Sequence, residues 1–147
     1  MNKEDPFDLN RFISAQAEVF QAALHELRAG RKRTHWMWFI FPQLSGLGSS
    51  PMSRRYAINS LDEAQAYLNH PVLGPRLKRC TETVLAVGGR SLHAIFGSPD
   101  DLKFGSSMTL FALAAGEEES VFRQALARYC EGRMDERTVA LCDAGPR

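Results

Sequence analysis

Paired cysteines and metal-binding motifs are missing from this sequence. Its three cysteines, Cys80, Cys130 and Cys142, lie far apart and form no Cys-x-x-Cys pair, which argues against a disulfide framework and a structural zinc site. We expect them to be reduced thiols packed as small apolar side chains. Because no His-x-x-x-His or Glu-x-x-His pair occurs, the sequence predicts no metal site, and no pattern in it points to a cofactor.

Long apolar runs, a secretion signal and a strong net charge are missing as well. The longest apolar run is Trp36 to Phe41, far short of the roughly 20 residues that a membrane span requires. The stretch MNKEDPFD at the start is polar and acidic, unlike a signal peptide. We therefore expect a cytoplasmic protein that does not interact with a membrane. A net charge of +1 makes nucleic acid an unfavoured partner, and RNA contact through the basic run 28–35 is the alternative.

The alternation of apolar and polar residues that is typical of β-strands is also absent, whereas helix signals recur along the chain. Ser50-Pro51, Ser60-x-x-Glu63 and residues 98–101 are typical helix starts. Apolar residues at helical spacing run from Leu9 to Gly30, as one helix or as two that break near 14–17. The sequence thus predicts an all-α fold.

We expect a single compact domain over residues 1–147, with its core at about 9–141. About seven or eight helices should surround a central aromatic helix at His35–Phe41, because this segment is apolar nearly all round. Its polar ring atoms belong to His35, Trp36 and Trp38, and Gln43 adds an amide directly after Pro42. Such residues suit a pocket wall that stacks on a flat ligand, although composition alone favours a core helix.

A turn rich in glycine and serine, SGLGSS at 45–50, follows the aromatic segment. Backbone amides at 48–50 precede a helix start, and Arg54 and Tyr56 follow within a turn or two. This arrangement predicts a site for a phosphate or a carboxylate, with Arg55 as the alternative guanidinium. The spacing matches neither the Rossmann nor the Walker motif, so a flexible connection with an ordinary helix cap is the competing interpretation.

A second polar segment lies in the middle of the helix predicted after residue 98. Gly105, Ser106 and Ser107 lower helix propensity by roughly 1–2 kcal/mol in total relative to alanine. Either a close helix crossing or a bound ligand should compensate for this loss. In the ligand interpretation, Lys103 and the serine hydroxyls face the glycine-rich turn.

The segment HWMWFIFPQLSGLGSSPMSRRYAI closely resembles a signature of DUF1810, a bacterial family of unknown function. The resemblance continues through EAQAYLNHPVLGPRL and IFGSPDDLKFGSSMTLFALA and covers roughly residues 9–141. It implies a compact, mostly helical domain and supplies neither an activity nor a cofactor. Its signature stretches are the polar and aromatic segments described above, which favours a shared ligand pocket.

Two functional hypotheses follow. The first is a pocket for a nucleotide-like or other phosphorylated small molecule, an anionic ligand held by the 35–56 and 103–108 segments. The second is a helical protein-interaction module without chemistry, whose partner the sequence does not name. Whether a reaction is catalysed stays open, and His35 is the acid/base candidate because its side chain titrates near neutral pH. The predicted ligand-binding residues are His35, Trp36, Trp38, Gln43, Gly48, Ser49, Ser50, Arg54, Tyr56, Lys103, Ser106 and Ser107.

Overall fold

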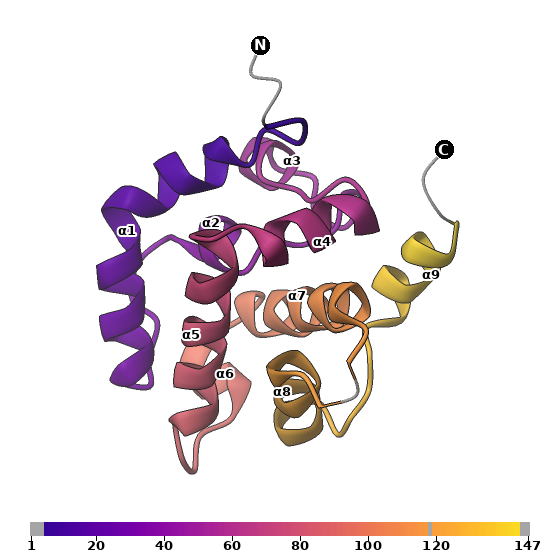
Figure 1. The fold of residues 1–147 in the computed structure, drawn as a ribbon. Coiled ribbons are helices and arrows are strands. Elements are labelled where there is room, and N and C mark those ends of the chain that lie inside the picture. Colours follow the sequence, from indigo (N-terminus) through magenta and orange to yellow (C-terminus); the bar gives the residue numbers. More distant parts are fainter. Residues whose placement is uncertain (1–4, 118, 145–147) are drawn as a thin grey trace.

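A computed structural model describes residues 5–117 and 119–144, and this part of the chain consists of helices and loops without β-strands (Figure 1). The all-α prediction is confirmed, with nine helices in the described residues, one more than the upper predicted number. Among the described residues, an isolated parallel bridge pairs Leu44 with Ile58. The helices are α1 (Asn10–Arg28), α2 (Met37–Ile40), α3 (Pro51–Arg55), α4 (Leu61–Asn69), α5 (Leu73–Ala86), α6 (Leu92–Phe96), α7 (Asp100–Ala115), α8 (Val121–Tyr129) and α9 (Glu136–Ala144).

Local sequence explains most helix starts. The hydroxyls of Ser50 and Ser60 each accept a hydrogen bond from the backbone N–H three residues on, as predicted for α3 and α4. The start of α7 differs from the expectation, because the cap residue is Pro99, which has no side-chain acceptor. The carboxylates of Asp100 and Asp101 instead interact with the positive end of the helix dipole in the first turn.

Helix α1 is one continuous helix, which resolves the alternative of a break near 14–17. Gln16 lies inside that stretch and is buried, and its amide donates to the Phe39 carbonyl at 2.7 Å and to the Tyr67 hydroxyl at 3.0 Å. These tertiary bonds hold the middle of α1 against the aromatic segment and α4. Gly30, at a φ of +76°, turns the chain after the helix ends.

The aromatic segment forms only one turn of helix, α2, instead of the full helix expected over 35–41. Phe41 precedes Pro42 and adopts φ −126° and ψ 72°, because a residue before proline is disfavoured in the helical region. The central helix is α7, which is buried around most of its surface. Figure 1 shows it between α4 and α8, and it also contacts α6 and α9.

A buried carboxylate holds the aromatic segment against α1. Glu26 accepts hydrogen bonds from the Arg33 amide at 2.7 Å, the Thr34 amide at 3.0 Å, the Thr34 hydroxyl at 2.6 Å and the Trp36 indole at 2.9 Å. Burial by itself raises the pKa of Glu26, but these hydrogen bonds outweigh burial and lower the pKa to about 2. The charged form of Glu26 therefore stabilises the loop that leads into α2.

Four aromatic rings join this segment to α6 and α7. Phe41 contacts Phe96 and Phe104 edge to face, with ring centroids 5.9 and 5.1 Å apart, and Phe96 stacks on Phe104 at 5.0 Å. Trp36 packs at the edge of the cluster, 6.5 Å from Phe96. Because all four side chains are buried, the backbone on either side of α2 is fixed relative to α7.

Within the described chain, no helix has the length and apolarity needed to cross a membrane.

Candidate ligand-binding site

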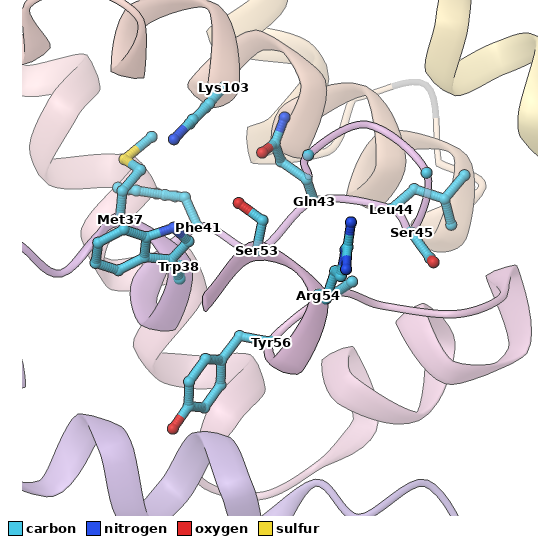
Figure 2. A pocket seen from close by; sticks show the side chains of 13 residues that line it. Met37, Trp38, Phe41, Gln43, Leu44, Ser45, Ser53, Arg54, Tyr56 and Lys103 are labelled. Carbon is cyan, nitrogen blue, oxygen red and sulfur yellow. The ribbon is translucent and has the colours of Figure 1, made fainter. Parts of the chain in front are cut away.

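A small cavity lies between the segment 37–57 and the start of α7. Its volume is about 30 Å³. Figure 2 shows its lining side chains, which come from α2, α3, the turn between them and Lys103 of α7. The lining residues are Met37, Trp38, Phe41, Gln43, Leu44, Ser45, Gly46, Gly48, Ser53, Arg54, Tyr56, Ala57 and Lys103.

Hydrogen-bond donors dominate the polar part of this lining. The Trp38 indole N–H is buried and has no acceptor among the described residues. The Ser53 hydroxyl accepts a hydrogen bond from Ser50 at 2.9 Å, which leaves its own proton free to donate. In Figure 2 the Trp38 nitrogen, the Ser53 hydroxyl and the Lys103 ammonium lie on the same side of the pocket. Gln43 adds an amide that can donate or accept.

The charged groups of the lining are both cationic. Arg54 is exposed and forms no ion pair with any described residue, and Figure 2 places its guanidinium beside the turn that carries Ser45. The Lys103 side chain is 26% exposed, and its Nζ lies 5.8 Å from the Trp38 ring centroid. Because none of the lining residues is acidic, the formal charge of the lining is positive.

The nearest carboxylate belongs to Asp100, one turn before Lys103 on α7. Its Oδ2 lies 2.9 Å from the Lys32 ammonium in a mostly buried ion pair, whereas its Oδ1 is 3.7 Å from the Lys103 ammonium. Asp100 thus pairs chiefly with Lys32 and neutralises Lys103 only in part. This arrangement positions the Lys103 side chain and leaves part of its charge for the cavity.

Backbone contacts explain why the glycine-rich turn holds this shape. Gly48 lies against α3, and a Cβ added there would come within 2.6 Å of the Ser53 Cβ. Gly46 has a φ of +99°, which favours glycine. The Ile58 amide donates to the Gln43 carbonyl at 2.9 Å, and the Ser45 amide donates to the Ile58 carbonyl at 2.7 Å. The start of the turn is therefore held by backbone hydrogen bonds to Ile58, and Gly48 packs against α3.

The structure brings half of the residues singled out from the sequence into the cavity lining. Trp36 and Ser107 lie in the core, and His35, Ser49 and Ser50 are exposed outside the lining. Arg54, and not Arg55, is the guanidinium that lines the cavity. The predicted residues that line it are Trp38, Gln43, Gly48, Arg54, Tyr56 and Lys103.

Ser106 lines a different hollow, an open groove of about 400 Å³ between α6, α7 and the chain that leads to α9. Its hydroxyl donates to the Leu102 carbonyl at 3.3 Å. The Ser107 hydroxyl is buried without a partner among the described residues. No close helix crossing explains Gly105, since a Cβ there would meet only the Cys130 sulfur at 3.7 Å. The polar residues of α7 therefore lie in three places. Lys103 lines the cavity, Ser106 lines the groove and Ser107 is in the core.

Sequence reasoning did not identify several lining residues. Met37, Phe41, Leu44 and Ala57 form the apolar wall, and nothing in their sequence context separates them from ordinary core residues. Ser53 carried one signal that could have been used, because it lies next to Arg54 and three residues after the cap Ser50. That spacing places its hydroxyl beside the cap on the first turn of α3.

The described residues include no cluster of histidine, cysteine and carboxylate side chains that could hold a metal ion. The cysteines are free thiols, and burial raises the pKa of each. For Cys80 the pKa reaches about 12, so this thiol stays protonated at neutral pH. The polar groups of the cavity lining are mainly uncharged hydrogen-bond donors and two cations.

Comparison with known proteins agrees with this architecture. A crystal structure of the conserved hypothetical protein Rv1873 from Mycobacterium tuberculosis is 61% identical, with a TM-score of 0.92, over 95% of this chain and 99% of that one. No curated protein matches the chain. The family model described as "Protein of unknown function (DUF1810)" matches residues 6–142. The chain therefore belongs to the DUF1810 family.

Proposed function

We propose that the protein binds a phosphorylated small molecule whose phosphate group occupies the cavity between α2, α3 and Lys103. One observation carries this proposal. The Trp38 indole N–H is buried without an acceptor in a cavity that is lined by two cations and by no carboxylate. An unpaired buried donor costs about 1–3 kcal/mol, and a bound oxyanion would remove this cost.

The donors around the cavity suit an oxyanion better than a neutral or cationic ligand. Hydrogen bonds to a charged oxygen are shorter and stronger than those to a neutral acceptor. Arg54 and Lys103 supply charge, while Trp38 and Ser53 supply directed donors from the wall. A cation would face two positive side chains without a carboxylate in the lining.

The volume of the cavity limits what enters it. About 10–15 Å³ on this measure holds one water molecule, so 30 Å³ accommodates a group of a few atoms. A whole nucleotide requires several hundred Å³. The remainder of the ligand therefore lies outside, over the exposed turn that includes Ser45 and Gly46. Trp36 does not stack on this part of the ligand, because its side chain is fully buried.

The test is a titration with inorganic phosphate, followed by a thermal-shift screen of nucleotides, NAD, ADP-ribose and sugar phosphates. A ligand at about 100 times its dissociation constant adds roughly 2.7 kcal/mol of stability, which raises the melting temperature by several degrees. We expect Arg54→Gln and Trp38→Phe each to weaken phosphate binding. The matched control is Arg55→Gln, because Arg55 is also exposed on the same helix but does not line the cavity.

Two results would contradict the proposal. One is the absence of any stabilisation by phosphate or by any phosphorylated compound of the screen. The other is binding that Arg55→Gln weakens as much as Arg54→Gln, because the anion would then bind to the general basic surface of α3. Heteronuclear NMR of backbone amides at 43–57 during the titration locates the bound anion independently.

A further inference from the structure

We propose that the cavity selects the dianionic terminal phosphate of a phosphomonoester and discriminates against phosphodiesters and internal phosphates. This inference rests on the proposed function and specifies its ligand class. It follows from three features of the same cavity: the balance of charges, the buried apolar residues of the lining and the donors.

The charges of the lining match a dianion. Arg54 and Lys103 contribute two positive charges, and the lining contains no acidic residue. Asp100, the carboxylate near Lys103, is held by Lys32 at 2.9 Å. A phosphomonoester carries close to two negative charges at neutral pH, because its second pKa is about 6. A diester carries only one negative charge, so one of the two cations of the lining would stay uncompensated.

The buried apolar residues of the lining limit the room for a second ester substituent. Met37, Phe41, Leu44 and Ala57 are each at most 7% exposed and form the apolar part of the lining. A group of a few atoms fills the 30 Å³ of space. A monoester phosphate extends its one carbon-bearing oxygen toward solvent. A diester has two such oxygens, and the second would meet these residues.

The donors of the lining favour the more highly charged oxygens of a monoester. A monoester presents three terminal oxygens, which can receive bonds from the Trp38 indole, the Ser53 hydroxyl and the Lys103 ammonium, which lie on one side of the pocket in Figure 2. Arg54 approaches from the other side. A diester has only two terminal oxygens, which share a single negative charge, so the hydrogen bonds from the same donors are weaker.

The experiment compares methyl phosphate, dimethyl phosphate and sulfate by calorimetric titration of the full chain. At pH 7.5 we expect methyl phosphate to bind at least tenfold more tightly than dimethyl phosphate. Between pH 7.5 and pH 5 the affinity for methyl phosphate should fall, because the ligand takes up its second proton. Sulfate stays dianionic throughout and should show no parallel loss.

Sulfate also controls for titration of the protein. The charged groups around the site are Arg54 on α3, Lys103 and Asp100 on α7, Lys32 before α2, and Arg137 on α9, which donates to the Gly46 carbonyl at 3.2 Å; the cavity lining contains no histidine. If sulfate and methyl phosphate lose affinity together as the pH falls, the protein titrates and the selection of a dianion is wrong. Arg55→Gln should keep the discrimination between the two phosphates, and Arg54→Gln should reduce it.

The possible failures are distinguishable. Equal affinity for methyl and dimethyl phosphate, with both weakened by Arg54→Gln, overturns the inference and leaves the proposed phosphate site standing. No binding by inorganic phosphate, methyl phosphate or sulfate, together with no stabilisation by any phosphorylated compound of the screen, overturns both. Tight binding of methyl phosphate that falls with its protonation, beside weak binding of dimethyl phosphate, supports both.

Discussion

The Trp36 indole nitrogen donates a 2.9 Å hydrogen bond to the Glu26 carboxylate. This bond separates it from Trp38, two residues away, whose indole N–H is also buried but has no acceptor among the described residues. The two tryptophans of this short segment therefore have different roles. Trp36 is part of the core, and Trp38 lines the cavity with an unused donor.

Replacing each tryptophan by phenylalanine tests this difference. Trp36→Phe removes a bond to a buried carboxylate and a fully buried ring, so we expect a loss of at least about 2 kcal/mol in the free energy of unfolding. Trp38→Phe removes a donor that is already unpaired, so the loss without ligand should stay below about 1 kcal/mol. Urea denaturation at pH 7 measures both, and equal losses would contradict the assignment.

Glu26 predicts a dependence of stability on pH. Its pKa is about 2 in the folded protein against 4.5 for an ordinary glutamate, so its stabilising effect is present above pH 4.5 and is lost as the pH falls toward 2. The loss should be on the order of 2 kcal/mol. In Glu26→Gln the stabilisation by the carboxylate should already be missing at pH 7. The decline of the free energy of unfolding below pH 4.5 should therefore be smaller than in the wild type. Glu18→Gln, an exposed change on the same helix, should retain the decline of the wild type.

Gly48→Ala tests the packing of the turn against α3. The new Cβ would lie 2.6 Å from the Ser53 Cβ, so the turn must shift, and we expect a loss of about 1–3 kcal/mol in stability together with weaker phosphate binding. Gly88→Ala is the control, because a Cβ there meets nothing within 4 Å. Thermal denaturation and phosphate titration give the two values, and identical behaviour of the two variants would refute the packing argument.

Gly105→Ala should stabilise the protein. The residue lies inside α7, a Cβ would meet only the Cys130 sulfur at 3.7 Å, and alanine favours helix by about 0.8–1.0 kcal/mol over glycine. We expect a rise of roughly 2–4 °C in the melting temperature. A lower melting temperature would show that α7 packs more tightly at this position than the structure indicates.

The features that the sequence predicted well depend on local chemistry. Ser50 and Ser60 cap helices because their hydroxyls reach backbone amides three residues away, whatever the rest of the chain does. The region of the cavity was also predictable, since Trp38, Arg54 and Lys103 stand out by residue type. The length of α2 differs from the prediction, because Pro42 disfavours the helical region for Phe41 even though the run of apolar residues continues through it.

Local sequence is enough to predict the helical fold, the starts of most helices and the stretches in which a site would lie, because caps and helical periodicity act over a few residues. Long-range packing is needed to turn Trp36 toward Glu26 and Trp38 toward the cavity, and to place Arg54 rather than Arg55 in the lining. Orientation about a single helical turn depends on which distant surface packs against it. Here that surface comes from α1 and α7, and no local rule contains it.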